Sequence, residues 1–251
     1  MNRFHSAGFR FYNWARSIIT PGLRNAQYEY KELLNSLVKR ETRWLDLGCG
    51  RRLLPEWMPN ADQEQVEMTR RAQLVVGIDP DFFSLRDNRL VRDRVAADSH
   101  LPFADDTFTL LSANMVIEHV EDPDVLLREA CRVLRKGGIF VFHTPNLRSY
   151  ATFLATLVPE SWKVHLIRRM DGRQEEDVFP VRYLMNTEQK VREYAARAGF
   201  HVLEVRMTES SAQAVMLGPI VVAELLWIRL LRVRAMEGLR SNIIATLQKA
   251  G

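Results

Sequence analysis

The sequence feature that most constrains the fold is a short apolar run that ends in a carboxylate and a glycine turn. Residues 44–50 read WLDLGCG, in which Asp46 stands two positions before Gly48 and is followed by Cys49 and Gly50. Glycines in such a turn let the backbone bend sharply and let a ligand approach without meeting a Cβ atom. A carboxylate at this point opposes a pyrophosphate and attracts an ammonium group. The segment therefore predicts a strand that opens into a loop for a ligand bearing an ammonium.

Four later segments also place a polar residue or a glycine turn beside an apolar run. They are residues 74–80 (LVVGIDP, with Asp79 and Pro80), 96–103 (AADSHLPF, with Asp98 and Ser99), 108–120 (FTLLSANMVIEHV, with Asn114) and 134–142 (LRKGGIFVF). In this order the five segments resemble the class I S-adenosylmethionine-dependent methyltransferases, over about residues 43–146. S-adenosylmethionine carries an ammonium, a carboxylate and a sulfonium where NAD carries two phosphates, so the charge of Asp46 agrees with the resemblance.

The resemblance implies a set of cofactor-binding residues at the carboxyl ends of the strands. Asp79 takes the place of the acid that holds the two ribose hydroxyls, and Asp98 the place of the acid that faces the adenine amino group. The full set is Asp46, Gly48, Cys49, Gly50, Asp79, Pro80, Asp98, Ser99 and Asn114. Asp and Asn are also common in turns and helix caps, which is the alternative interpretation for each of them.

Two departures from the family pattern qualify the resemblance. Arg52 occupies the place of the third glycine, which puts a long cationic side chain near the expected cofactor mouth. Gly50 and Asp79 are 79 − 50 = 29 residues apart, against about 20 between glycine turn and acid in a compact βαβ unit. Residues 53–60 are the expected insertion, in which Pro55 and Pro59 interrupt helix.

Strands that alternate with helices predict an α/β fold with a mostly parallel, doubly wound, Rossmann-like sheet. Strands are expected at 43–47, 74–78, 92–97, 108–114, 139–143, 201–207 and 242–247, and helices at 22–40, 61–72, 81–89, 123–135, 149–170, 187–197 and 220–237. In the family the seventh strand runs antiparallel to the others, which this pattern allows.

The length of 251 residues, 47% of them apolar, suits one methyltransferase domain with appendages. Its expected parts are an N-terminal helical cap (1–40), a cofactor-binding core (41–146), a substrate-cap insertion (147–185) and the remaining part of the sheet (186–251). The insertion contains a charged stretch with glycine and proline at 168–180, interpreted either as a solvated loop or as a lid over the acceptor.

Methyl transfer to a hydroxyl is helped by a base of near-neutral pKa, for which histidine is best suited. His119 follows the fourth expected strand, where the family places residues close to the transferable methyl group, and His143 ends the fifth. Both are candidate catalytic residues, and a packed structural histidine is the alternative for each. No spacing of His, Cys, Asp or Glu reads as a metal site, although the adjacent carboxylates at 175–177 leave one open.

The composition indicates which binding partners and which cellular compartment are expected. The net charge of +4 is concentrated in the first forty residues and near the other end. There it is interleaved with aromatic and aliphatic residues, so peripheral contact with an anionic membrane is one interpretation and a cap over the core the other. No transmembrane segment or cleavable signal is expected. Two cysteines suit a reducing cytoplasm, and no nucleic-acid motif is present.

These observations predict an S-adenosylmethionine-dependent methyltransferase that acts on a small-molecule acceptor, most simply at oxygen. Residues 118–123 (EHVEDP) resemble the branch that contains quinone, polyketide and sugar methyltransferases, and the basic amphipathic ends add a lipid-linked or hydrophobic acceptor as a hypothesis. Two alternatives stay open: an inactive cofactor-binding or partner-binding subunit, which Arg52 favours, and a NAD-type oxidoreductase, which Asp46 disfavours. The acceptor, the methylated atom and the oligomeric state are not determined by the sequence.

Overall fold

The computed structural model describes residues 3–91, 93–95, 100–157, 180–215 and 219–251. The chain forms two compact units. Unit 1 consists of Met1–Glu29, Pro145–Val178 and Met207–Ile243, and unit 2 of Tyr30–Thr144, Phe179–Arg206 and Ile244–Gly251. The sequence-based division into one domain with a cap and an insertion stays a prediction.

Unit 2 is built around a seven-stranded sheet with the order β3-β2-β1-β4-β5-β7-β6. The strands are β1 (Arg43–Leu47), β2 (Leu74–Ile78), β3 (Asp93–Val95), β4 (Phe108–Asn114), β5 (Leu134–Pro145), β6 (Phe200–Thr208) and β7 (Asn242–Lys249). The pairs β1–β2, β1–β4, β2–β3 and β4–β5 are parallel. Strand β1 lies inside the sheet and is buried from Trp44 to Leu47, which explains why Asp46 is its only polar residue after Arg43.

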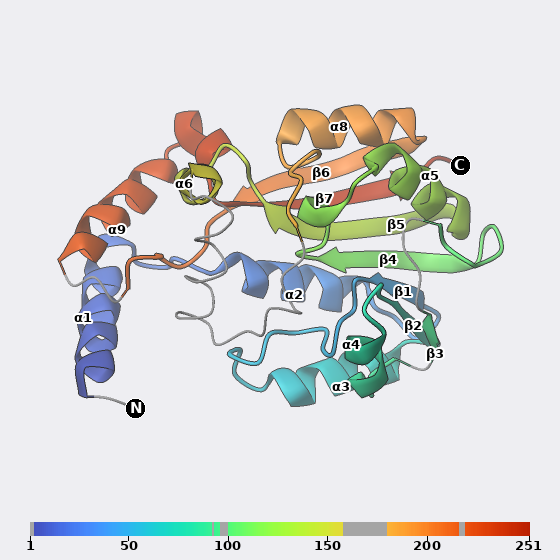
Figure 1. Ribbon diagram of the computed structural model, residues 1–251, viewed down its shortest axis with the longest axis horizontal. Coiled ribbons are helices and arrows are strands. Elements are labelled where there is room, and N and C mark those ends of the chain that lie inside the picture. Colours follow the sequence, from blue (N-terminus) through green and yellow to red (C-terminus); the bar gives the residue numbers. More distant parts are fainter. Residues whose placement is uncertain (1–2, 92, 96–99, 158–179, 216–218) are drawn as a thin grey trace. The chain divides into compact units, whose positions relative to one another are not determined.

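Strand β7 runs against its neighbours. The side-chain Nζ of Lys249 at its end donates to the carbonyl of Leu134 at the start of β5 (2.7 Å), and the amide of Ala250 donates to the carbonyl of Gly199 just before β6 (3.3 Å). The last residues of β7 therefore lie beside the first residues of both neighbours, and the arrows in Figure 1 run accordingly. The expected α/β class and antiparallel last strand are confirmed.

Helices cover both faces of this sheet (Figure 1). They are α2 (Ala26–Leu37), α3 (Ala61–Arg71), α4 (Phe82–Asp87), α5 (Pro123–Val133) and α8 (Glu188–Arg197). One face buries a cluster in which Tyr30 and Leu34 of α2 and Met68 of α3 pack on Trp44 and Leu110 of the central strands. Because in-register neighbours share a face, Asp46 and Ser112 point toward this same α2-covered side.

Unit 1 contains α1 (Arg3–Ile19), α6 (Tyr150–Leu157), α9 (Ile220–Leu231) and the 3₁₀ helix η3 (Arg234–Leu239). Its core joins Tyr12 and Ala15 of α1 to Val221, Leu225 and Ile228 of α9. Among the described residues, no helix has the length and apolarity that crossing a bilayer requires. The expected helix over 149–170 is described only to Leu157, and the predicted lid at 168–179 lies outside the described residues.

Two expected boundaries differ from the structure by five residues or more. The strand expected at 139–143 begins earlier than predicted, since β5 already begins at Leu134, which pairs with Phe108 before a shift in register. Gly137 there has φ +73°, so the glycine is accommodated within the strand as an irregularity. The expected helix over 220–237 ends at Leu231 and is followed by η3. The insertion at 53–60 forms no helix, and α3 begins directly after it, as predicted.

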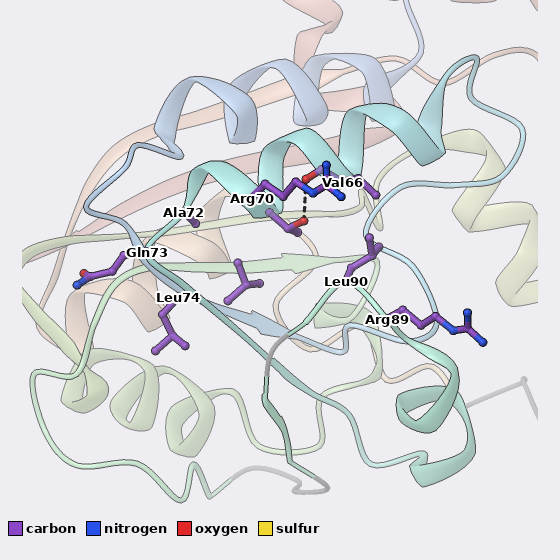
Figure 2. Close-up of a pocket in the computed structure, with 9 residues that line it drawn as sticks. Val66, Arg70, Ala72, Gln73, Leu74, Arg89 and Leu90 are labelled. Carbon is purple, nitrogen blue, oxygen red and sulfur yellow. Dashed lines mark hydrogen bonds between the residues drawn. The ribbon is translucent and has the colours of Figure 1, made fainter.

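A hollow of about 360 Å³ opens at the amino end of β2 (Figure 2). Its lining includes Val66 and Arg70 of α3, Leu74 at the first position of β2, and Leu90. Asp79 follows the opposite end of the same strand. This hollow is therefore separate from the edge where an open parallel sheet binds its ligand.

Candidate cofactor and active site

Glycine is needed at the two positions of the turn after β1 for different physical reasons. Both have positive φ, +61° at Gly48 and +46° at Gly50. A Cβ on Gly48 would stand 2.3 Å from Cγ2 of Val116, so the backbone must lie bare against the segment after β4. A Cβ on Gly50 would meet no described atom within 4 Å. Gly48 is required by packing, whereas Gly50 faces space that a ligand can fill.

Hydrogen bonds from β2 and the segment after α4 hold this turn in place. Cys49 N donates to Ile78 O (3.1 Å), and Asn88 Nδ2 donates to Gly50 O (2.9 Å). The Cys49 side chain is buried, and burial raises the pKa of its thiol, which favours the neutral thiol over the nucleophilic thiolate. Asn88 was missed from the sequence, where an Asn after a short helix gives no signal beyond an ordinary turn.

Asp79 closes the other side of the turn. Its Oδ2 accepts from Gly50 N and its Oδ1 from Asp81 N, each at 2.9 Å. Each carboxylate oxygen has a second lone pair, so Asp79 retains acceptor capacity for ribose hydroxyls. Burial raises its pKa despite these two bonds. Pro80, which follows, is exposed.

Asp46 lies at the end of a short buried chain of hydrogen bonds. Trp44 Nε1 donates to Ser112 Oγ (2.6 Å), and Ser112 Oγ donates to Asp46 Oδ1. The phenol of Tyr30 lies on the same side, close enough for the Asp46 charge to raise its pKa further beyond the effect of burial. Burial raises the pKa of Asp46 itself from 3.8 to about 7. A cationic group brought beside it would favour the ionised carboxylate.

The raised pKa of Asp46 has a measurable consequence for stability. The pKa in the folded state lies above that in the unfolded chain, so this group favours folding at low pH, and the contribution is lost as the pH rises toward 7. Asp46→Asn lacks this pH-dependent group. We therefore expect the difference in free energy of unfolding, Asp46→Asn minus unchanged protein, to increase by roughly 2 to 3 kcal/mol from pH 5 to pH 8. Urea unfolding without cofactor measures it. The exposed Asp87→Asn is the control, and a constant difference between Asp46→Asn and the unchanged protein would contradict the expectation.

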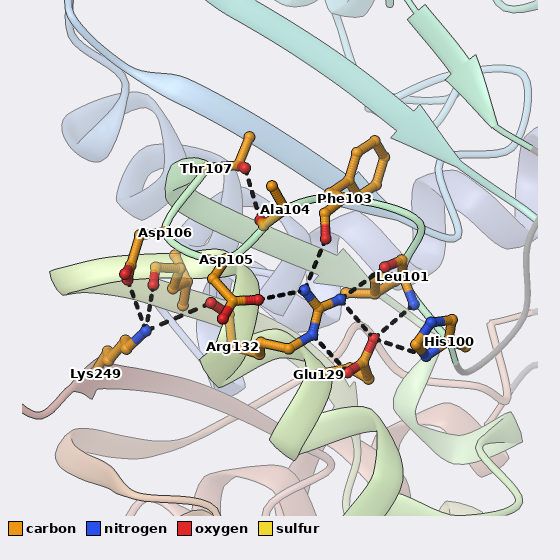
Figure 3. Close-up of polar contacts among 11 residues, drawn as sticks. His100, Leu101, Phe103, Ala104, Asp105, Asp106, Thr107, Glu129, Arg132 and Lys249 are labelled. Carbon is orange, nitrogen blue, oxygen red and sulfur yellow. Dashed lines mark hydrogen bonds and ion pairs between the residues drawn. The ribbon is translucent and has the colours of Figure 1, made fainter.

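Asp98 and Ser99 lie outside the described residues, but the segment that follows them is firmly held (Figure 3). Arg132 of α5 donates to the carbonyls of Leu101 (2.8 Å) and Phe103 (2.7 Å) and to both carboxylate oxygens of Glu129 (2.8 Å each). Glu129 in turn accepts from Leu101 N (3.0 Å), and its hydrogen bonds with Arg132 hold its pKa down at about 2. Arg132 thus anchors the chain directly after Asp98 and Ser99 to α5.

Arg52 is paired within its own loop and the helix that follows. Its guanidinium forms ion pairs with Asp62 (2.9 Å) at the start of α3 and with Glu56 (3.4 Å). The cation that replaces the third glycine is thus balanced by nearby acids.

The two candidate histidines have different surroundings. His143 at the end of β5 is buried; its Nδ1 lies 2.9 Å from Asn114 Oδ1 and its ring packs 5.7 Å from that of Tyr30. Asn114 and His143 are also register partners, so these positions of β4 and β5 lie side by side. These contacts fit a packed residue that positions Asn114.

His119 is half-buried in the turn η1 (Ile117–His119), which follows β4. Its Nδ1 lies 3.0 Å from Pro180 O. A carbonyl can only accept, so this contact assigns the proton to Nδ1 and leaves Nε2 as the basic nitrogen of the neutral ring.

A buried carboxyl group fixes the turn that carries His119. Glu118 accepts from Thr144 Oγ1 (2.9 Å), and Thr144 Oγ1 accepts from Asn186 Nδ2 (2.7 Å). The backbone carbonyl of Glu118 accepts from the amides of Arg182 and Tyr183. These bonds tie η1, the end of β5 and residues 182–186 together, and sequence inspection missed them because they join segments far apart in the chain.

The residues fit S-adenosylmethionine in three respects. Gly50 leaves open space beside the turn. Asp79 presents carboxylate oxygens at the end of β2, where ribose hydroxyls would bind. Asp46 offers a buried carboxyl group whose ionisation an ammonium would favour.

A seven-stranded sheet of this order, with a glycine turn after β1 and carboxylates after β1 and β2, defines a class I S-adenosylmethionine-dependent methyltransferase fold. Residues 23–205 match the family model described as Methyltransferase domain. The chain belongs to this family, and S-adenosylmethionine is the cofactor of its class. The oxidoreductase alternative is thereby set aside.

Relatives and solved structures agree with this assignment. A ubiquinone biosynthesis O-methyltransferase from Rhodopseudomonas palustris is 28% identical over 149 residues, 55% of this chain and 53% of that protein. Methyltransferase GfsG from Streptomyces halstedii is 34% identical over 124 residues, 47% of this chain and 43% of that protein. The chain spans about half the length of the curated relatives it matches.

Two solved structures show the fold alone, because they are distant in sequence. An S-adenosylmethionine dependent methyltransferase from Mesorhizobium loti superposes with a TM-score of 0.56 at 20% identity, covering 89% of this chain and 98% of that one. The [4+2]-cyclase SpnF gives 0.54 at 17% identity, covering 99% and 97%. Since a cyclase shares the fold, the reaction must be argued from the site.

Proposed function

We propose that this protein transfers the methyl group of S-adenosylmethionine to a hydroxyl oxygen of a small, largely apolar molecule. The observation that carries the proposal is His119, whose contact with Pro180 O leaves Nε2 basic on the segment after β4. That segment follows the strand beside the glycine turn, where the class places groups near the reacting carbon. His119 and the cofactor-binding residues keep these roles as part of the proposal.

The chemistry divides between cofactor and chain. When bound, S-adenosylmethionine supplies an electrophilic methyl carbon on a positively charged sulfur. The hydroxyl oxygen of the acceptor forms the new bond to that carbon as the carbon–sulfur bond breaks, and His119 Nε2 takes the hydroxyl proton. The buried Glu118 and its partner Thr144 keep the turn that carries His119 in place.

The apolar nature of the acceptor is inferred from Met115. This residue directly follows β4, has φ +57° and exposes its side chain. A left-handed conformation is costly for a residue with a side chain and is concentrated at functional sites. An exposed thioether side chain at this edge suits an apolar ring or chain. The O-methyltransferases of ubiquinone biosynthesis among the relatives support an acceptor of phenolic character.

The experiment combines cofactor binding with transfer of a labelled methyl group. Purified protein is titrated with S-adenosylhomocysteine, then incubated with methyl-labelled S-adenosylmethionine and a panel of phenols, alcohols and amines, each with and without an apolar tail. We expect label on the oxygen of an apolar phenol. Transfer to amines alone would overturn oxygen as the target, and cofactor binding without transfer to any acceptor would favour the inactive-subunit alternative.

A further inference from the structure

Helices α1 and α9 of unit 1 have two unlike faces. They contact one another (Figure 1), and their inner faces bury Tyr12 and Ala15 from α1 and Val221, Leu225 and Ile228 from α9. This cluster accounts for the inner half of each amphipathic helix. The outer faces are not covered by any described part of the chain.

The outer face of each helix carries an apolar stripe. On α1, Trp14 is 60% exposed and Ile18, one turn later, is also exposed. On α9, Leu226 is 54% exposed and Leu230, four residues later, is also exposed, and the exposed Val233 follows just after the helix. Side chains at these spacings line one side of a helix. An exposed apolar surface on two neighbouring helices is typical of an interaction surface.

The charges beside these stripes are positive. Arg10 lies one turn before Trp14, and the sequence of α1 contains no Asp or Glu. Arg229 and Arg232 donate to the carbonyls of Ile19 and Pro21, which places their cations at the α1–α9 junction, and the exposed Arg234 follows.

The carboxylates near α9 already have partners. Glu224 accepts from Tyr150 and from the amides of Gln213 and Ala214, and Glu237 pairs with Arg240. Among the described residues of this surface, Arg10, Arg229, Arg232 and Arg234 outnumber Glu224, so the surface carries a net positive charge.

We propose that the outer faces of α1 and α9 dock on an anionic lipid bilayer. Leucine, isoleucine and tryptophan side chains enter the headgroup region, and the neighbouring arginines pair with lipid phosphates. Neither helix is long and apolar enough to cross a membrane, so the proposed contact is peripheral. A second copy of this chain is a poorer occupant, because a two-fold interface would bring two surfaces of the same net positive charge together.

The surface is tested by flotation of the full chain with vesicles. We expect binding to vesicles of phosphatidylcholine with phosphatidylglycerol, weaker binding at high salt, and little binding to phosphatidylcholine alone. Trp14→Gln and Leu226→Gln should each weaken binding about tenfold, because each removes one inserted side chain. The matched control is Trp57→Gln in unit 2, since Trp57 is 57% exposed and should leave binding unchanged.

Three outcomes would overturn the proposal. These are equal binding to neutral vesicles, an equal loss of binding in Trp57→Gln, and unchanged binding in both surface variants. Light scattering of the same variants tests the rival occupant, since dissociation of a dimer by Trp14→Gln or Leu226→Gln would assign the face to a second copy. Binding of S-adenosylhomocysteine should be equal in all variants, which separates this test from that of the methyltransferase activity.

Discussion

Gly50→Leu is expected to weaken binding of S-adenosylhomocysteine by about 100-fold or more while the protein remains folded. A Cβ at Gly50 would meet no described atom within 4 Å, so the turn has room for the start of a side chain. The positive φ of +46° adds strain of only about 1 to 2 kcal/mol. The loss should therefore come from the ligand that the side chain displaces. Isothermal titration calorimetry measures the affinity, and thermal unfolding checks the fold.

Two other glycines give matched comparisons. Gly22→Leu introduces the same side chain at φ +74°, also into open space, but in unit 1, and it should leave cofactor affinity unchanged. Gly48→Ala should lower both stability and affinity, because its Cβ meets Val116, and the added change Val116→Ala should restore part of both. Wild-type affinity in Gly50→Leu would remove the turn from the cofactor site.

The sequence predicted the parts of the fold that depend on local pattern. The bounds of β1, β2 and β4 agree with the expected ones because each strand is largely apolar and buried in the sheet, and each ends at or directly before a glycine or a polar residue. The helix expected at 187–197 is found as α8, whose N-cap is Thr187, and the Thr187 side chain accepts from Lys190 N. Register then brings the ends of these parallel strands to one edge of the sheet, which positions Asp46 and Asp79.

Features that depend on contacts between distant segments were not predictable. The pattern treated Gly48 and Gly50 alike, although the first is set by Val116, 68 residues away (116 − 48 = 68). The negative charge of Asp46 could be predicted from the sequence. Its raised pKa could not, because the pKa depends on burial among groups from other elements, including Ser112 of β4. The start of β5 was missed because a glycine pair normally ends a strand. Here β5 pairs with β4 on both sides of the glycines, at Leu134 with Phe108 and at Ile139 with Leu110.

His119→Ala is expected to lower kcat by about 100-fold or more, because the acceptor proton loses its base, while affinity for S-adenosylhomocysteine stays nearly unchanged. Substitution by alanine also removes the contact with Pro180 O, so a loss of rate alone would not separate catalysis from packing. His119→Asn separates them, since an asparagine amide placed near Nδ1 still donates to that carbonyl but offers no base.

If His119 is the base, both variants are slow and the asparagine variant has native thermal stability. If the residue only packs, asparagine restores turnover. Steady-state rates with the acceptor found in the labelled-methyl panel decide between these outcomes. His201→Ala, at an exposed position on β6, is the control for loss of a histidine elsewhere. Because the base acts only during transfer, the effect should fall on kcat and leave the KM for S-adenosylmethionine close to that of the unchanged protein.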